Sequence, residues 1–378
     1  MDNYFLLKHN DIEVATLKLN EDYRVIEVLN INNFNHLPNY IKIKEKQDNI
    51  TFDDWLQNRY ISPSRKGVKD LMKVLNIDSP IKLLIENNAL SLTDHYWICK
   101  KNEDKLWKNI NYFENVYSED VGKFLVGNFK GIINSITPEG TSRGALQKYW
   151  EIDGNDRYLI KGGIKPFYQE PINEIISSKI LKHLGIEHTE YKKKIIGDKL
   201  YSKCKNYLGS NNEEVLAWEI NSLYNNDKIY SYDNYIKCLE SIGLKNEKDY
   251  INKMIFIDYL IGNTDRHGEN YGVMRDAKSL EYKKIIPIFD FGNSLYHNEE
   301  IINIIYDDPV NSILFNKSNE ENMENITDYN WLDKIKLNEL PDLVKKELKD
   351  LQLSDDRKKM IVNVINNRVK NINKIVQI

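Results

Sequence analysis

The chain has 378 residues, of which 41% are hydrophobic and 29% are charged. At roughly 100–200 residues per domain, this length predicts two or three structural units and excludes a single small module. The 53 basic residues are nearly balanced by 57 acidic ones, which gives a formal net charge of -4. Such a chain lacks the basic surplus typical of nucleic-acid-binding proteins, so no nucleic-acid partner is expected.

The sequence has no feature typical of a membrane or secreted protein. No apolar run approaches the ~18 residues that a membrane-spanning helix needs. The start, Met1-Asp2-Asn3-Tyr4, lacks the basic and then apolar character of a signal peptide. We therefore expect a cytoplasmic protein with no membrane partner. The three cysteines, Cys99, Cys204 and Cys238, are too few and too widely spaced for a disulfide framework or a zinc site, and buried thiols are expected.

The first 129 residues are predicted to form an accessory α/β domain. Short strands are expected at 4–7, 14–17 and 25–28, because apolar runs alternate there with turns rich in Asn and Asp. Ser62 as an N-cap and Pro63 as the first helical residue then predict an amphipathic helix. Its basic residues fit either a site for an anionic partner or a solvent-exposed face, and the acidic balance of the chain favours the exposed face: Arg65, Lys66, Lys69 and Lys73.

Residues 130–213 are predicted to be rich in strands. A glycine-containing turn at 138–144 precedes two strand-like runs, 148–152 and 157–160, which Asp153-Gly154 joins as a hairpin. Pro171 then begins a predicted helix with a buried apolar face, and Gly185 ends it. Two further strands are expected at 191–196 and 199–204.

Residues 214–378 are predicted to be mainly helical. A nearly wholly apolar helix is expected at 251–261, and a long amphipathic helix is expected from Ser354 to the end. A strand-rich lobe thus precedes a helical lobe, so the predicted fold class is α+β with two lobes and the additional N-terminal domain. The predicted boundaries are 1–129, 130–213 and 214–378.

The most informative segment is Asn263-Thr-Asp-Arg-His-Gly-Glu-Asn270, directly after the apolar helix. Asp265 and Asn270 are five residues apart, the separation of the base and the metal-binding asparagine in the catalytic loop of protein kinases. The spacing suits phosphoryl transfer, because one oxygen must accept a proton from the attacking hydroxyl while a second holds a divalent ion near the same phosphate.

A second motif follows twenty residues after Asn270, where the apolar run 285–289 leads to Asp290-Phe291-Gly292. An ionised aspartate at the end of such a strand is costly to bury unless it meets a cation, and Mg²⁺ on nucleotide phosphates would provide one. The tripeptide alone fits an ordinary turn at a strand end. Its order after Asp265 and Asn270 makes Asp290 a candidate metal ligand.

A kinase also needs a strand lysine for the ATP phosphates and an acidic helix residue that holds this lysine. Lys161, at the end of Tyr158-Leu-Ile-Lys161, and Glu174, near the start of the Pro171 helix, are the candidates. Lys148 is the rival of Lys161 and could itself contact phosphate, and Glu170 is the rival of Glu174. The phosphates themselves would be covered by the turn before the hairpin, through Gly140, Thr141, Ser142, Arg143 and Gly144.

These residues resemble the HipA-like kinases, which include serine/threonine kinases of bacterial toxin–antitoxin systems. The resemblance covers roughly 130–310 and depends on Gly162-Gly163, on Leu260-Ile-Gly-Asn-Thr-Asp-Arg-His-Gly-Glu-Asn270 and on Pro287-Ile-Phe-Asp290. It implies a bilobal kinase fold, ATP and Mg²⁺ as cofactors, and a nucleotide-binding lobe at 130–213. It also implies that Asp265 is catalytic, that Asn270 and Asp290 bind the metal, and that Lys161 contacts ATP.

Two further residues have alternative roles. His267 would either support catalysis or hydrogen-bond the loop backbone, and both readings stay open. Asp258, on the apolar helix, would either brace the loop or face solvent, and its apolar surroundings favour bracing.

The chain departs from the family in its phosphate loop, where it reads Gly144-Ala-Leu-Gln-Lys148. Thr141 and Ser142 are therefore only candidate autophosphorylation sites. The prediction is an ATP- and Mg²⁺-dependent kinase that phosphorylates serine or threonine of a protein, itself included, with an antitoxin-like regulatory partner as a further candidate. One alternative is a phosphoinositide or other lipid kinase, which the acidic chain disfavours. The other is a catalytically silent binding module with a kinase fold. Such a module commonly lacks the lysine, the base or a metal ligand, and this chain has a candidate for each.

Overall fold

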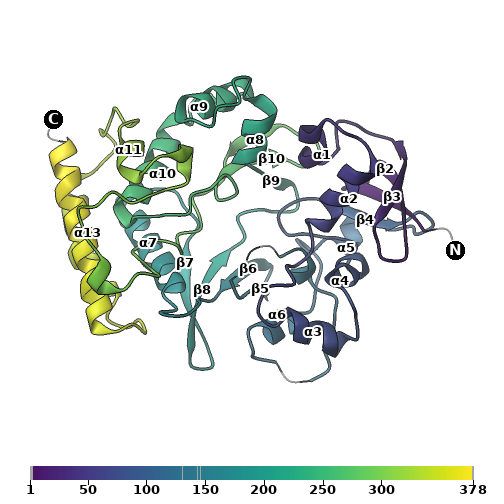
Figure 1. Cartoon of the computed structure of the whole chain (residues 1–378), viewed down its shortest axis with the longest axis horizontal. Coiled ribbons are helices and arrows are strands. Elements are labelled where there is room, and N and C mark those ends of the chain that lie inside the picture. The colour runs from purple at the N-terminus through teal and green to yellow at the C-terminus, as the bar shows by residue number, and fades with distance from the viewer. Residues whose placement is uncertain (1–2, 130, 143, 145, 377–378) are drawn as a thin grey trace. The chain divides into compact units, whose positions relative to one another are not determined.

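The computed structural model describes residues 3–129, 131–142, 144 and 146–376. This part of the chain folds into two compact units, whose elements are labelled in Figure 1. The first unit comprises Met1–Lys161, Asn206–Val215 and Met274–Lys283, and the second comprises Gly162–Lys205, Leu216–Val273 and Lys284–Ile378. The predicted boundary between residues 129 and 130 lies inside the first unit. The division into three domains stays a prediction.

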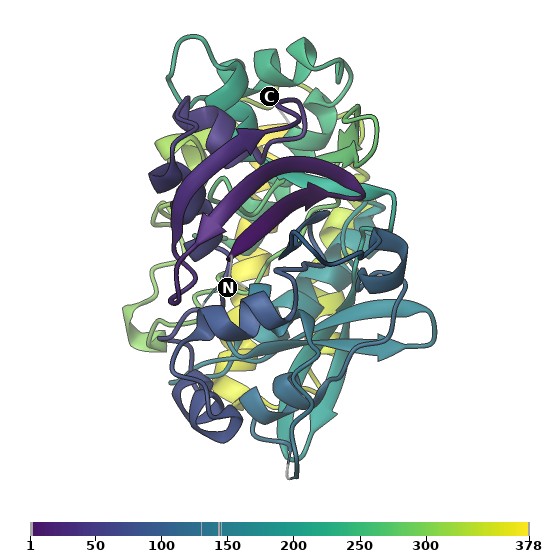
Figure 2. The ribbon, with the colours of Figure 1, turned by 90° about the vertical axis from the view of Figure 1, so that its right-hand side faces the viewer.

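The first unit begins with a four-stranded antiparallel sheet in the order β3-β2-β1-β4. Its strands are β1 (Tyr4–His9), β2 (Ile12–Leu19), β3 (Val25–Ile31) and β4 (Tyr96–Lys100), and Figure 2 shows the first three side by side in purple. Helix α2 (Asn49–Gln57) starts at Asp48, whose side chain accepts a hydrogen bond from the Thr51 N–H. Apolar residues of the sheet and of α2 form one core, including Leu7, Leu17, Phe52 and Leu56.

The rest of the first unit consists of short helices and a hairpin. The helices are α1 (Asn39–Lys44), α3 (Val68–Leu75), α4 (Pro80–Glu86), α5 (Trp107–Ile110), α6 (Asp120–Leu125) and the 3₁₀ turn η1 (Pro138–Thr141). A second core joins α3, α4 and α6 through Val68, Leu71, Leu83, Val121 and Leu125. The hairpin pairs β5 (Lys148–Asp153) with β6 (Asp156–Lys161). A three-stranded sheet has the order β11-β10-β9, with β9 (Asn212–Leu216), β10 (Gly272–Asp276) and β11 (Tyr282–Ile285), and most of its residues belong to the first unit.

The second unit is mostly helical. Its α7 (Glu170–Leu184) has Pro171 in its first turn and ends at Gly185, which takes left-handed backbone with φ of 73°. β7 (Tyr191–Ile196) and β8 (Lys199–Lys205) form an antiparallel hairpin. The other helical elements are α8 (Ala217–Tyr224), α9 (Tyr232–Ser241), α10 (Lys248–Ile261), η2 (Ile301–Asn303), η3 (Leu314–Asn316), α11 (Asn319–Met323), α12 (Lys334–Glu347) and α13 (Asp355–Val376). Among the described residues, no helix is long and apolar enough to cross a membrane.

Most elements expected from the sequence are confirmed within one or two residues, including α7, both hairpins and α13. The helix expected from Pro63 is wrong at its start, because α3 begins only at Val68 after Gly67, which has a positive φ of 88°. The three cysteines are buried, as expected.

A buried polar cluster in the first unit links β1 to β9 and β10. His9 Nε2 lies 2.9 Å from a Glu213 carboxylate oxygen, and its Nδ1 lies 2.8 Å from Nδ1 of His36. Arg275 Nε donates to the other Glu213 oxygen at 2.9 Å. Burial alone raises the pKa of Glu213, but His9 and Arg275 outweigh it and hold this pKa well below its ordinary value. Burial, and then the nearby His9, lowers the pKa of His36 to about 4.

From this cluster we predict that acid lowers the free energy of unfolding through His36, at a pH above that at which Glu213 takes up a proton. An unfolded His36 takes up a proton near its ordinary pKa of 6.5, whereas the folded one does so only near 4, so the unfolded state binds more protons between these values. We expect the free energy of unfolding to fall by at most about 3 kcal/mol, which is what a pKa difference of this size corresponds to, as the pH falls through this window. Urea denaturation should show a flatter slope in His36→Asn than in the wild type, and equal slopes would contradict the account. Both proteins keep a common slope from His95, His188 and His297, whose pKa values burial also lowers.

Candidate active site

The loop 263–270 leaves the end of α10, a helix of the second unit whose second half is completely buried. From Met254 to Ile261 every residue of α10 is buried, and Gly262 closes the helix with a left-handed φ of 60°. The Asn263 N–H then donates to the Asp258 carbonyl at 2.8 Å. A loop that starts from such a helix has a fixed origin, which a catalytic segment requires.

Asp258 and Arg266 form a buried ion pair beneath this loop. Arg266 Nε and one terminal nitrogen donate to the two Asp258 oxygens, each at 2.9 Å, and both side chains are 0–1% exposed. Asn263 also donates its amide to Asp258 at 2.8 Å. Asp258 therefore braces the loop, and the bracing role favoured from the sequence is confirmed.

The remaining Arg266 nitrogen joins the loop to the strand-like segment before Asp290. It donates to the Asn270 carbonyl at 2.8 Å and to the Phe289 carbonyl at 2.5 Å. The guanidinium also lies 5.7 Å from the centre of the Phe291 ring, which is fully buried. One side chain thus holds the backbone at Asn270 and directly before Asp290, the two predicted metal ligands.

Asp265 is held at its backbone and at one carboxylate oxygen. Its N–H donates to the Asn263 side-chain oxygen at 3.1 Å, and its carbonyl accepts from the Asn270 amide at 2.7 Å. Oδ2 accepts from the Asn293 amide at 2.7 Å. The side chain is 35% exposed, so the carboxylate is anchored yet accessible to a reactant.

Asn270 and Asp290, the predicted metal ligands, carry oxygen atoms of the kind that Mg²⁺ prefers. The Asn270 amide nitrogen donates to the Asp265 carbonyl, so the amide oxygen of Asn270 points away from that carbonyl. Asp290 takes a left-handed φ of 59°, and its N–H donates to the Tyr191 hydroxyl at 3.1 Å. Among the described residues, no cluster of three or more His, Cys, Asp or Glu could hold a metal alone. Mg²⁺ suits two protein oxygens because it usually keeps water and substrate phosphate as its other ligands.

His267 contacts the loop backbone. Its Nδ1 accepts from the Glu269 N–H at 3.2 Å, while its Nε2 lies 3.9 Å from Asp265 Oδ1. The first contact is a hydrogen bond to the loop backbone, which is one of the two roles expected for His267 from the sequence. The second is too long for a hydrogen bond.

The acidic candidates on α7 have distinct partners. Glu174 is 2% exposed and accepts a hydrogen bond from the Ser202 hydroxyl on β8. Glu170 accepts from the Ile164 N–H at 3.2 Å, and burial raises its pKa. Lys161 is buried at the end of β6 in the first unit, so its predicted pairing with Glu174 or Glu170 stays a prediction.

The predicted phosphate loop is a packed turn of the first unit. Gly140 belongs to η1, and its carbonyl accepts from the Ile61 N–H at 2.8 Å. The Thr141 hydroxyl donates to the carbonyls of Leu90 and Pro138 at 3.0 and 3.1 Å. Gly144 has a φ of 85°, and a β-carbon there would lie 3.1 Å from Lys148 Nζ, so this lysine approaches the loop as expected. Arg143 lies outside the described residues.

Arg65 anchors this loop from another part of the first unit, and the sequence did not indicate this role. It was expected on an exposed helix face, but it lies before α3 and is 2% exposed. Its guanidinium donates to the Ser142 carbonyl at 2.6 Å, to the Ser142 hydroxyl at 3.2 Å and to the Gly144 carbonyl at 2.7 and 3.0 Å. Beside it, burial raises the pKa of Glu139 to about 7. No local sequence pattern indicates these contacts of Arg65, because its partners lie about eighty residues away in the chain.

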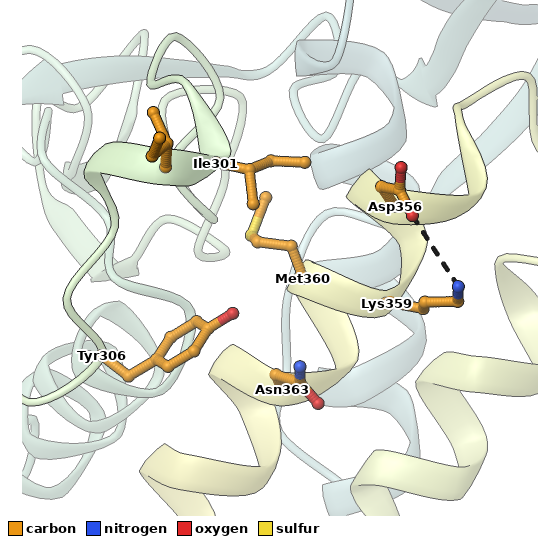
Figure 3. A pocket seen from close by; sticks show the side chains of 7 residues that line it. Ile301, Tyr306, Asp356, Lys359, Met360 and Asn363 are labelled. Carbon is orange, nitrogen blue, oxygen red and sulfur yellow. Dashed lines mark ion pairs between the residues drawn. The ribbon is translucent and has the colours of Figure 1, made fainter.

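A separate pocket of about 450 Å³ lies on the second unit between η2 and α13 (Figure 3). It is lined by Ile301, Ile302, Tyr306, Asp356, Lys359, Met360 and Asn363, and Asp356 pairs with Lys359 at 3.7 Å. None of the predicted site residues lines it, so it has no part in the candidate active site.

Comparison with solved structures identifies the fold. A chain of the solved complex of HipA, HipB and operator DNA, from a toxin–antitoxin system of Shewanella oneidensis MR-1, aligns with a TM-score of 0.53. The alignment covers 98% of this chain and 97% of that one at 14% sequence identity. This protein has a HipA-like kinase fold. The resemblance and the α+β kinase-like fold predicted from the sequence are confirmed.

Comparison of sequences gives shorter matches, and no family model matches the chain. The serine/threonine-protein kinase CtkA of Helicobacter pylori (strain J99 / ATCC 700824) is 29% identical over 163 residues, 38% of this chain and 48% of the relative. A tRNA dimethylallyltransferase of Campylobacter lari (strain RM2100 / D67 / ATCC BAA-1060) is 29% identical over 116 residues, 29% of this chain and 37% of the relative. Each match spans less than half of the relative's length. The two relatives are named for different activities.

The Asp258–Arg266 pair predicts a large effect of one buried charge. Asp258→Asn keeps the shape of the side chain but leaves the Arg266 guanidinium buried without a counter-charge, which should cost about 3–5 kcal/mol of unfolding free energy. Asp249→Asn removes an exposed charge from the first turn of the same helix and should cost about 1 kcal/mol or less. Urea denaturation measures both, and equal losses would contradict the bracing role.

Arg65 gives a second comparison of matched variants. Arg65→Met removes the donors for the Ser142 and Gly144 carbonyls and should cost about 2–4 kcal/mol. The neighbouring Lys66 is exposed, so Lys66→Met should change stability by about 0.5 kcal/mol or less. Thermal or urea unfolding distinguishes them. A loss confined to Lys66→Met, or absent from both, would show that Arg65 does not anchor the loop.

Proposed function

We propose that this protein is an ATP- and Mg²⁺-dependent kinase that transfers the γ-phosphate of ATP to a serine or threonine hydroxyl of a protein, itself included. The observation that carries the proposal is the arrangement of Asp265, Asn270 and Asp290 around the buried Arg266. These are the groups that phosphoryl transfer needs, in the order in which kinases place them. The HipA-like fold and the match to a protein named as a serine/threonine kinase support the same reaction class.

Asp265 is the proposed catalytic aspartate. Its carboxylate would orient the attacking hydroxyl and accept its proton as the oxygen–phosphorus bond forms and the bond from the γ-phosphorus to the leaving oxygen of ADP breaks. The Asn293 bond to Oδ2 leaves Oδ1 to face the hydroxyl. Asn270 and Asp290 would hold the divalent ion, which neutralises phosphate charge when it is bound.

The residues proposed to bind the nucleotide are those that the sequence indicates. Lys161 and Lys148 would contact phosphate, Glu174 would hold the lysine, and the backbone of Gly140, Thr141, Ser142 and Gly144 would cover the phosphates. A regulatory partner comparable to HipB is a further proposal, because the structural neighbour comes from a complex with that protein and DNA. The charge of -4 gives no support to a lipid kinase.

The proposal is tested by intact mass spectrometry after incubation with ATP and Mg²⁺, together with transfer of labelled γ-phosphate to a protein mixture. Wild type should gain one or more phosphates or label a substrate. Asp265→Asn should reduce the rate by about 10²-fold or more, because it removes the proton acceptor without changing its shape. Asp290→Ala should abolish transfer, and Asp249→Asn is the matched control that retains it. Equal transfer in all four proteins would refute the assigned residues.

A further inference from the structure

Asn293, three residues after Asp290, binds the start of the catalytic loop through both its side chain and its backbone. Its side-chain amide donates to Asp265 Oδ2 at 2.7 Å. Its backbone carbonyl accepts from the Thr264 N–H at 3.0 Å and from the Thr264 hydroxyl at 3.1 Å. Two adjacent residues of the loop are therefore held by one asparagine that lies outside it.

Asn173, a fully buried residue of α7, holds the backbone on both sides of Asn293. Its amide nitrogen donates to the Gly292 carbonyl at 2.9 Å and to the Ser294 carbonyl at 2.6 Å. A single NH₂ group thus bridges two carbonyls that flank Asn293. Since the amide cannot turn without losing both bonds, the position of the Asn293 backbone follows that of α7.

A second buried side chain supports Asn173. Gln169, just before α7, donates to the Asn173 side-chain oxygen at 3.0 Å and to the Leu295 carbonyl at 2.9 Å. Arg357 of α13 in turn donates to the Gln169 side-chain oxygen at 2.7 Å. Asn173, Gln169 and Arg357 are 0–3% exposed, so these bonds are shielded from competing water.

We propose that Asn293 is the positioning residue of the Asp265 carboxylate, and that Asn173 acts through it to couple the start of α7 to the catalytic aspartate. The inference rests on the proposed function, and it concerns how Asp265 is positioned within the same site. A neutral amide suits this position because it fixes Oδ2 without cancelling the negative charge that must accept a proton. A lysine would neutralise that charge, and an aspartate would repel it.

The contacts give an order to the effects of substitution. Asn293→Ala frees the Asp265 side chain and should lower kcat by about 10–100-fold, because small displacements of a catalytic group cost rate steeply. The KM for ATP should change by about twofold or less, since Asn293 is not proposed to touch nucleotide. Asn293→Asp keeps the shape but replaces the donor with a second negative charge beside Asp265. It should therefore be at least as impaired as Asn293→Ala.

The experiment measures kcat, the KM for ATP and the melting temperature for these variants and for Asn298→Ala, an exposed asparagine five residues further along. A packing role alone would make Asn293→Asp the milder variant, and that ranking would overturn the inference. A kcat close to wild type in Asn293→Ala would overturn it as well. A fall in kcat with an unchanged KM, absent from Asn298→Ala, is the expected result.

The coupling to α7 is tested by a double-mutant cycle with Asn173→Ser. If Asn173 acts through Asn293, the double variant should be within about threefold of Asn293→Ala alone. Multiplied losses in kcat would mean that the two residues act independently and would overturn the coupling. Failure of the proposed function looks different: wild type itself would transfer no phosphate while still binding ATP and Mg²⁺, and the inference would fall with it.

Discussion

The candidate site depends on a buried guanidinium. Arg266 is fully buried, and a charge removed from water is tolerated only when nearly all its donors are satisfied. Asp258 provides the counter-charge, and the carbonyls of Asn270 and Phe289 accept the remaining bonds. Burial alone lowers the pKa of Arg266, but the Asp258 charge and its hydrogen bonds outweigh this and raise it. The charged form that the site requires is therefore the form that the fold maintains.

This arrangement explains how residues from separate segments meet. The guanidinium fixes where the loop ends at Asn270 and where the chain arrives before Asp290. Asn293 holds one oxygen of Asp265, and Asn173 holds the backbone on both sides of Asn293. The backbone bonds within the loop alone would leave the carboxylate free to rotate. Precise placement of a catalytic group requires such supporting contacts.

The sequence predicted those features whose signals are local. Proline in the first turn and glycine at the end bounded α7, and the Asp-Gly turn located the β5–β6 hairpin, because both signals act over a few residues. The motif around Asp265 is also a local signal, because phosphoryl transfer would fix its spacing, and its catalytic role stays a prediction. Asp258 was also assigned correctly, because a lone carboxylate in an apolar helix must find a partner.

Features that depend on distant partners were missed. Arg65 has the helical spacing of a basic surface face, yet its donors meet carbonyls of Ser142 and Gly144. Asn293 is one of many asparagines in the chain, and only the fold shows that its amide reaches Asp265. In both cases the identity of the residue is compatible with solvent, and tertiary contacts decide its role.

The central claim is that Asp265 takes part in the chemical step and not in holding the nucleotide. Single-turnover transfer from bound ATP, measured beside the dissociation constant for ATP and Mg²⁺, separates the two. The account predicts that Asp265→Asn binds the nucleotide as wild type does, within about threefold, while the transfer step slows by about 10²-fold or more. A wild-type transfer rate in this variant, or a loss explained wholly by weaker nucleotide binding, would contradict it.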